Sequence, residues 1–158
     1  VVFHQELAPL QAAEYEALKA LVMQSARDFQ ALYEAIPDQD RTCLPPRKTF
    51  YGAVPRTARE MYEHTKNVND YYFGEIGVTA DHEGTIVECR LRGFAALERQ
   101  EGYLQNTAME GSYGETWTLR KVLRRFLWHD RIHAKAMYRM ARQTFPEPVN
   151  NAFLFSSK

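Results

Sequence analysis

Apolar residues recur at intervals of three and four along most of the chain. Between Leu10 and Ile36 they return at the spacing that places them on one face of a helix. Residues 119–143 give the clearest case, because their apolar residues share one arc of a helical wheel and most of their basic residues lie opposite. No stretch alternates apolar and polar residues in the way of a half-buried strand. The pattern therefore predicts an all-α fold built from long amphipathic helices.

Capping residues and prolines mark where the predicted helices begin and end. Thr57 with Glu60, and Thr85 with Glu88, have the spacing of a capping box, in which a hydroxyl and a carboxylate satisfy free backbone N–H groups. Prolines follow the first and the last helix and forbid their continuation. The predicted core helices cover residues about 9–36, 58–76, 86–109 and 119–143.

These helices predict a single domain, residues 1–158, with the architecture of a four-helix bundle. The connection between helices one and two, residues 37–56, is longer than the turn that joins antiparallel neighbours. We expect it to cross the bundle from end to end or to cover one mouth of it, as a packed loop. The C-terminal tail, residues 146–158, carries Phe153, Leu154 and Phe155. We expect this apolar tail to dock on the bundle or on a second copy of the chain, and we predict a symmetric homodimer.

Composition narrows the class of protein without indicating an activity. Of the 158 residues, 45% are hydrophobic and 25% are charged, which is ordinary for a globular domain. Twenty basic and twenty acidic residues give a formal net charge of zero, so no overall field draws the chain to nucleic acid or to an anionic membrane. Cys43 and Cys89 are too few for a disulfide scaffold. With no apolar run of about 20 residues and no secretory signal pattern, we expect a cytoplasmic protein that does not enter a membrane.

Three polar residues interrupt the apolar arc of the last helix: His129, Asp130 and His133. The two histidines are four residues apart, so their rings leave the same face of the helix close enough to bind one ion. His64 lies toward the edge of the apolar face of the second helix and is the third candidate ligand. We therefore predict a mononuclear metal site formed by His64, His129 and His133. The alternative is a pair of core histidines held by hydrogen bonds to neighbouring helices.

Other metal sites fit the spacing less well. The segment HDRIH has Asp where zinc peptidases have Glu, and no suitable third ligand follows it. The paired Glu-x-x-His motifs of di-iron bundles are absent from the sequence. An iron site of two histidines and one carboxylate stays open if Asp130 or Glu63 replaces His64, although both carboxylates leave their helices in unfavourable directions.

The segments around these histidines resemble the DinB/YfiT-like family of bacterial four-helix-bundle metalloproteins. The resemblance covers nearly the whole chain and is clearest in EMYEHTKNVNDYYFGEIG and WTLRKVLRRFLWHDRIHAKAMYRMA. It implies a homodimer and a site on His64, His129 and His133 that holds one divalent cation. We expect zinc and keep nickel and iron as alternatives. Many members of the family carry His where this chain has Arg125, so the role of that position is open here.

Three imidazole ligands leave one or two coordination positions open, and an ion held in this way converts a bound thiol or water into a nucleophile at neutral pH. Family members with a known activity transfer low-molecular-weight thiols, such as bacillithiol or mycothiol, to electrophiles, or isomerise or hydrolyse small molecules with them. The resemblance therefore implies a thiol transferase or hydrolase that acts on a small-molecule substrate. Asp130 is a candidate for proton transfer or for orienting a ligand, and its alternative is a buried salt bridge to Arg90 or Arg92.

Two other classes of function compete with a metalloenzyme. The basic face of the last helix is compatible with nucleic-acid binding, but zero net charge and the lack of interleaved aromatic residues argue against it. A bundle that binds a small ligand, with a structural metal or none, is the other alternative.

Neither cysteine is a good nucleophile. Cys43 lies in a proline-bounded loop, and Cys89 opens the third helix, where the helix dipole can lower its pKa but no histidine is near in sequence.

Overall fold

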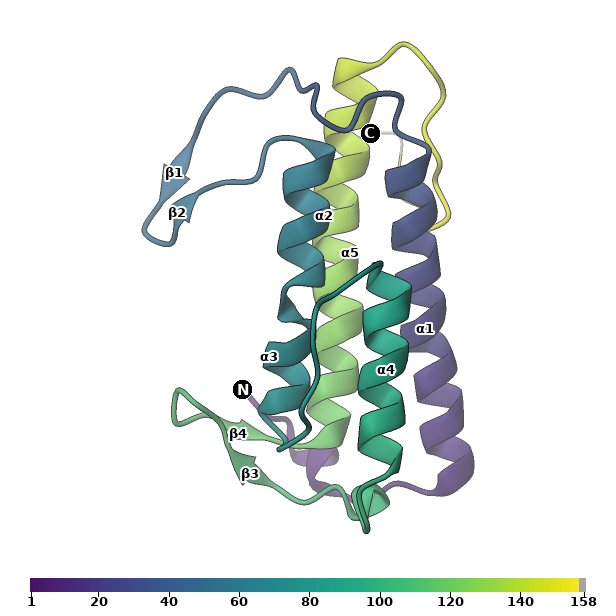
Figure 1. The fold of residues 1–158 in the computed structure, drawn as a ribbon, viewed down its shortest axis with the longest axis vertical. Coiled ribbons are helices and arrows are strands. Elements are labelled where there is room, and N and C mark those ends of the chain that lie inside the picture. The colour runs from purple at the N-terminus through teal and green to yellow at the C-terminus, as the bar shows by residue number, and fades with distance from the viewer. Residues whose placement is uncertain (157–158) are drawn as a thin grey trace.

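Helices account for most of residues 1–156, the part of the chain that this computed structural model describes. The α-helices are α1 Ala12–Glu34, α2 Ala58–Lys66, α3 Val68–Gly74, α4 Ile86–Glu98 and α5 Leu119–Thr144. They run side by side along the long axis of the molecule, and α5 packs against α1, α2 and α3 (Figure 1). The expectation of a mostly helical fold is confirmed. Within residues 1–156, every helix is too short or too polar to span a bilayer.

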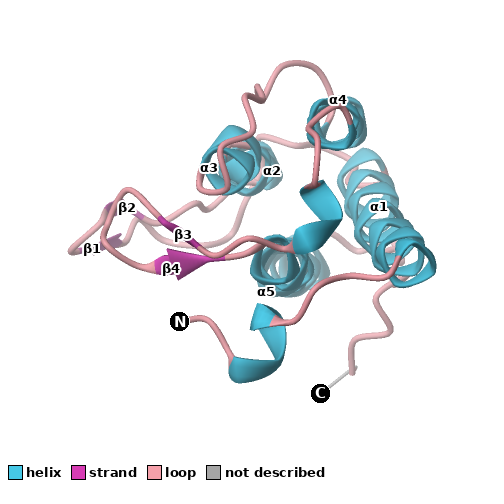
Figure 2. Cartoon of the chain, turned by 90° about the horizontal axis from the view of Figure 1, so that it is seen from below, coloured by secondary structure: helices cyan, strands magenta, loops and turns pink. Residues whose placement is uncertain are grey.

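Two antiparallel hairpins and two short 3-10 helices lie in the connections. These elements are β1 Lys48–Thr49 with β2 Gly52–Ala53, β3 Met109–Glu110 with β4 Thr116–Trp117, η1 His4–Leu7 and η2 Tyr103–Gln105. Both hairpins project from the same side of the helices, beside α2 and α3 (Figure 2). The sequence did not predict them, because strands of two residues are too short to show alternation.

The second predicted helix, residues 58–76, is divided into α2 and α3 at Asn67. Just before the break, the Thr65 hydroxyl donates a hydrogen bond of 2.7 Å to the backbone carbonyl of Met61. A threonine that bonds to the carbonyl four residues earlier competes with the helical ladder and bends the helix. Because of the break, α2 carries His64 and α3 carries the aromatic residues that follow it.

The third predicted helix, residues 86–109, ends at Glu98. Gly102 and Asn106 have φ values of 73° and 58°, in the left-handed region that a right-handed helix cannot contain. The residues after the helix form η2 and β3 instead. Gly102 therefore lies beyond the end of the helix, whereas the sequence analysis placed it inside.

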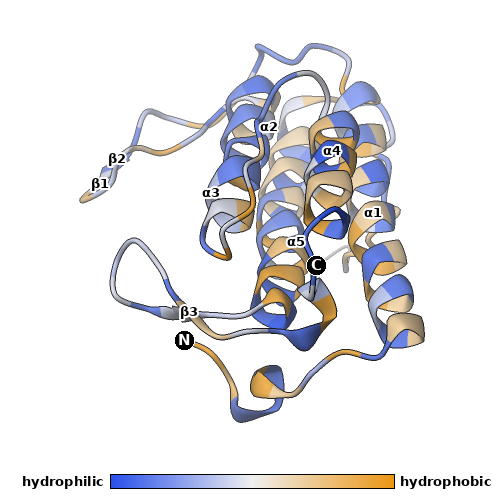
Figure 3. Ribbon diagram, turned by 60° about the horizontal axis from the view of Figure 1, so that its bottom comes forward, coloured by the Kyte–Doolittle hydropathy of each residue, from blue (hydrophilic) through white to orange (hydrophobic). Residues whose placement is uncertain are grey.

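The apolar arc predicted for the last helix forms the centre of the core. Its buried members are Leu119, Val122, Leu123, Phe126, Met137, Met140 and Ala141. Phe29 of α1, Phe73 of α3 and Phe94 of α4 pack around them. Figure 3 shows the same arrangement, with hydrophobic positions gathered where the helices face one another and hydrophilic positions on their outer sides.

Lys121 corrects the predicted polar face of this helix, because its side chain is fully buried. Its Nζ donates 2.8 Å to the Thr116 carbonyl, lies 3.0 Å from the Glu115 carboxylate and sits over the Trp117 ring. The long apolar stem of a lysine lets its charge reach a partner beyond the residue's own helical position. Here the partners lie in and next to β4, the strand before the helix, so Lys121 connects the β3–β4 hairpin to α5.

The long connection does not cover the helices with its aromatic residues. Residues 37–56 carry the β1–β2 hairpin, and Phe50 and Tyr51 at its turn are 96% and 94% exposed. The expectation of a packed loop is therefore wrong for this part of the connection.

The C-terminal tail docks on the helices of its own chain, which is the first of the two predicted arrangements. Phe155 is buried against Tyr138 of α5, at 5.5 Å between ring centroids, while Leu154 is exposed. Residues 157 and 158 of the predicted tail lie outside the described residues.

Close packing of α3 on α4 depends on Gly93. A Cβ atom at this position would overlap the Phe73 ring, which is itself fully buried. We expect Gly93→Ala to lower the free energy of unfolding by about 1–3 kcal/mol, because the ring has no space into which to move. Urea denaturation measures the change. Gly74→Ala is the matched control, since nothing lies within 4 Å of its added methyl group; equal effects of the two substitutions would contradict the packing argument.

Candidate metal centre

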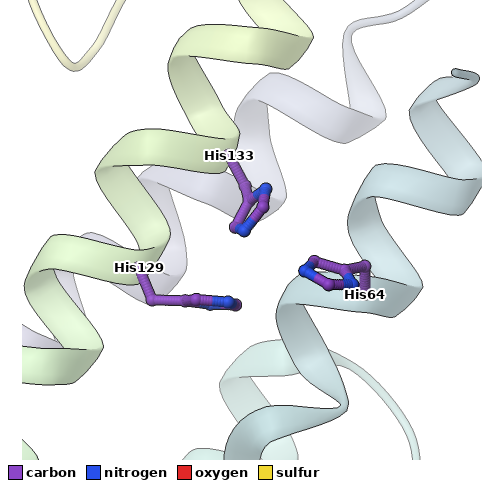
Figure 4. Close-up of side chains that lie close together, drawn as sticks. All are labelled: His64, His129 and His133. Carbon is purple, nitrogen blue, oxygen red and sulfur yellow. The ribbon is translucent and has the colours of Figure 1, made fainter. Parts of the chain in front are cut away.

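Three histidine side chains from two helices point toward one another. His64 projects from α2, while His129 and His133 project from successive turns of α5 (Figure 4). The nitrogens available as ligands on the three rings all lie within 4.8 Å of one another. The ring centroids are 4.4 Å apart for His129 and His133, 4.5 Å for His64 and His133, and 5.6 Å for His64 and His129. The structure thus brings together the three residues that the sequence analysis selected.

The local sequence explains why α2 presents His64 to α5. The Thr57 hydroxyl accepts the backbone N–H of Glu60 at 3.0 Å, which fixes the start of α2 as the capping-box pattern predicted. Five residues after Thr57, Tyr62 is buried and stacks on Tyr33 of α1 with 4.2 Å between ring centroids. His64 follows the buried Met61 by three positions, about 60° around the helix, so it leaves at the edge of the buried face and borders both α5 and solvent.

The three rings are neutral at physiological pH. Burial lowers the pKa of His129 to about 3, and repulsion from His133 and His64 acts in the same direction. Burial also lowers the pKa of His133 to about 4, with a smaller contribution from His64 that Asp130 opposes. His64 has its pKa lowered by burial alone. A metal ion therefore meets unprotonated imidazoles, which is the form that coordinates.

The hydrogen bonding of the rings fits a metal site. Within residues 1–156, no protein group forms a hydrogen bond with any of the three imidazoles, and Nδ1 of His129 is buried without a partner. A buried nitrogen left in this state costs about 1–3 kcal/mol. The alternative of core histidines held by neighbouring helices needs bonds that this part of the chain does not supply. Three unpaired imidazoles within 4.8 Å match the donors of a zinc-type ion, after a modest closing of the rings to bonds of about 2.0–2.1 Å.

Asp130 lies in the core beside this cluster, but its carboxylate has other partners. Oδ2 accepts hydrogen bonds from Ser25 at 2.7 Å and from Arg90 at 2.6 Å, and Oδ1 accepts a second bond from Arg90 at 2.8 Å. Of the two arginines considered, Arg90 forms the buried salt bridge, while Arg92 pairs with Asp81 at the surface. The contacts direct Asp130 toward α1 and α4, so it positions the α5 backbone next to His129 rather than reaching an imidazole.

The remaining candidates lie apart from the histidines. Among the described residues, no carboxylate joins the cluster, and Glu63 is exposed with its carboxylate 3.3 Å from Lys66. Cys43 is exposed in the long connection. Cys89 is fully buried, and burial raises the pKa of its thiol, so the lowering that the helix dipole suggested does not occur. Burial therefore makes Cys89 a poor nucleophile, and Cys43 lies outside the histidine cluster.

Two neighbours of the cluster were not predicted as site residues from the sequence. The Tyr72 ring of α3 lies 5.9 Å from the His129 ring, and the Arg125 guanidinium lies 5.8 Å from the Tyr72 ring. Tyr72 was not among the residues predicted from the sequence, and the role of Arg125 was open. The sequence spacing could have indicated Arg125, because residues 125, 129 and 133 follow one another at intervals of four along one stripe of α5.

Comparison with protein-family models, with curated proteins and with solved structures finds no match for this chain.

Proposed function

We propose that the chain is a metal-dependent enzyme of the DinB/YfiT-like kind, in which His64, His129 and His133 hold one divalent cation. In this proposal the fold is a four-helix bundle, with α2 and α3 together in the place of one helix. Zinc is the expected ion, with nickel and iron as alternatives. The observation that carries the proposal is the convergence of three neutral imidazoles without protein hydrogen-bond partners.

The number of ligands favours a catalytic over a structural role. Structural zinc sites use four protein ligands, whereas three ligands leave a position for an exogenous group. When bound, the cation supplies Lewis acidity that makes a coordinated thiol or water nucleophilic near neutral pH. His64 is exposed at one edge of the cluster, so a small molecule can approach from that side.

The protein residues hold and shape this site. Burial keeps the imidazoles of His129 and His133 neutral, and the Arg90–Asp130 pair fixes the turn of α5 that carries His129. The aromatic ring of Tyr72 lies next to the His129 ring and borders the site there. The expected chemistry is transfer of a low-molecular-weight thiol to a small electrophile, or hydrolysis, without a covalent intermediate on the protein.

Turnover of a thiol and an electrophile by zinc-loaded protein tests this function. We expect bacillithiol or mycothiol to react with a simple aryl halide faster in the presence of the protein, and His64→Ala to abolish the acceleration. Cys43→Ala and Cys89→Ala should leave it intact, because neither thiol belongs to the cluster. Inactive cysteine variants together with active metal-free protein would show that the assignment is wrong.

The nucleic-acid alternative loses part of its basis in the structure. Arg120 pairs with Glu14 at 2.7 Å, Arg124 pairs with Glu6, and Lys121 is buried, so these basic residues have partners within the chain. A small-ligand bundle with a structural metal stays an alternative, and an exchangeable ligand on the ion would distinguish it from an enzyme.

The homodimer and the small-molecule substrate belong to the proposal and rest on the resemblance, while the proposed cytoplasmic location rests on the sequence pattern alone. The apolar tail no longer argues for a dimer, since Phe155 is buried on its own chain and Phe153 packs beside it with 5.5 Å between ring centroids.

A further inference from the structure

Arg125 shares the face of α5 that carries the metal-site histidines. It lies four residues before His129, and therefore about one turn and roughly 5–6 Å away along the same stripe. The Tyr72 ring connects the two residues, at 5.8 Å from the guanidinium and 5.9 Å from the His129 ring. A positive charge thus lies beside the proposed metal position, on the side toward α3.

This arginine lacks the carboxylate partner that its neighbours have. Arg120 and Arg124, within the same turn and a half, are each paired with a glutamate. Among residues 1–156 no carboxylate pairs with Arg125, and its Nε is buried without a hydrogen-bond partner. Keeping a half-buried guanidinium without a counter-charge is unfavourable, so the arrangement calls for an anion from outside the chain.

Aromatic rings fix the position of the guanidinium. Its Cζ atom lies 4.8 Å from the Trp128 ring centroid, 5.8 Å from that of Tyr72 and 5.9 Å from that of Trp117. Burial raises the pKa of the Tyr72 hydroxyl, and the charge of Arg125 opposes this rise. Cation–π contacts hold the charge through the ring faces and leave in-plane N–H donors for a ligand. Trp128 is 49% exposed, so this group of side chains borders solvent at that ring, while Tyr72 and Trp117 are buried.

We propose that Arg125 recognises a carboxylate on the small molecule that binds at the histidine site. This inference rests on the proposed function, because the ligand atom at the other end is the thiol or other donor on the metal ion. The guanidinium presents paired N–H donors in the geometry that a carboxylate accepts. With about one helical turn between Arg125 and His129, the carboxylate and the metal-bound atom are expected a few bonds apart in the same molecule. The substrate class is therefore a small thiol acid or a similar short anionic ligand.

Thiol binding to Co²⁺-substituted protein tests the inference without turnover. The probes are 3-mercaptopropionate and 3-mercaptopropionamide, which differ only in the charge of the group distant from sulfur. Coordination of either thiolate produces a charge-transfer absorption that is titrated directly. In the wild type we expect the carboxylate to bind at least about tenfold more tightly than the amide, as for a hydrogen bond to a charged group.

Arg125→Gln should abolish this preference, and Arg125→Lys should retain part of it, while the Co²⁺ spectrum stays unchanged in both. Arg139→Gln is the matched control: it removes an exposed arginine about 21 Å further along the same helix and should preserve the wild-type preference. Equal affinities of the two thiols for the wild type, or an undiminished preference in Arg125→Gln, would overturn the role of Arg125 and leave the metal centre standing. Failure of the wild type to bind Co²⁺ would instead overturn the proposed function, and this inference with it.

Discussion

His129→Ala is expected to abolish stoichiometric binding of a divalent cation and the stabilisation that the cation gives to the fold. His129 is the most buried of the three histidines, and its ring contacts those of both His64 and His133. Without it, two imidazoles remain, which is too few to hold zinc against water and buffer. A cation that binds only the folded state stabilises it by about 2.7 kcal/mol at a free concentration 100 times its Kd. Elemental analysis and thermal melts with and without chelator measure both effects.

In the wild type, a chelator should lower the Tm and added zinc should restore it, whereas His129→Ala should respond to neither. His82→Ala is the control, because His82 lies outside the cluster with its Nδ1 3.0 Å from the Asp70 carboxylate. Equal metal content in wild type and His129→Ala would refute the ligand assignment, as would a wild type that stays metal-free after reconstitution.

Asp130→Ala is expected to cause the largest loss of stability of any substitution considered, about 3–5 kcal/mol. Arg90 and Asp130 are 1% and 0% exposed, and two hydrogen bonds of 2.6 and 2.8 Å join them. Removing the carboxylate leaves the guanidinium buried between α1 and α5, with the Val22 carbonyl at 3.2 Å as its remaining hydrogen-bond acceptor. Urea denaturation gives the free energy of unfolding directly.

A double substitution separates the charge from the loss of packing. Arg90→Met combined with Asp130→Leu should cost much less than Asp130→Ala alone, because a buried pair replaced by apolar residues leaves no unpaired charge. Asp81→Ala breaks an exposed pair with Arg92 and should change stability little. If Asp130→Ala were as mild as Asp81→Ala, the buried pair would not hold α5 in the way described.

Periodicity and histidine spacing were sufficient to predict the helical fold and to select the residues of the cluster. The apolar arc of α5 leaves the positions of His129 and His133 on its inner side, so the burial of His129 and the partial burial of His133 follow from the same pattern that predicts the helix. His64 was predicted from its position near the edge of the apolar face of the second helix. In the structure its ring centroid lies 4.5 Å from that of His133. Metal ligation by the three residues stays a prediction.

Features that depend on single side-chain bonds were not predictable in this way. The break at Asn67 accompanies a bond from the Thr65 hydroxyl, and nothing in the apolar pattern distinguishes that bond from an exposed hydroxyl. Lys121 is buried because its stem reaches Glu115, which lies outside the helix on which the wheel is drawn. Helical wheels describe where a side chain starts, whereas the partners of long polar side chains depend on the tertiary fold.

X-ray absorption spectroscopy of zinc-loaded protein tests the central claim most directly. The proposed centre predicts a shell with about three imidazole nitrogens at about 2.0–2.1 Å, together with a light exogenous ligand. Adding a small thiol should introduce one sulfur at about 2.3 Å, and His64→Ala should reduce the imidazole contribution. A shell of cysteine sulfur in the absence of added thiol, or a spectrum that His64→Ala leaves unchanged, would contradict a metal centre formed by His64, His129 and His133.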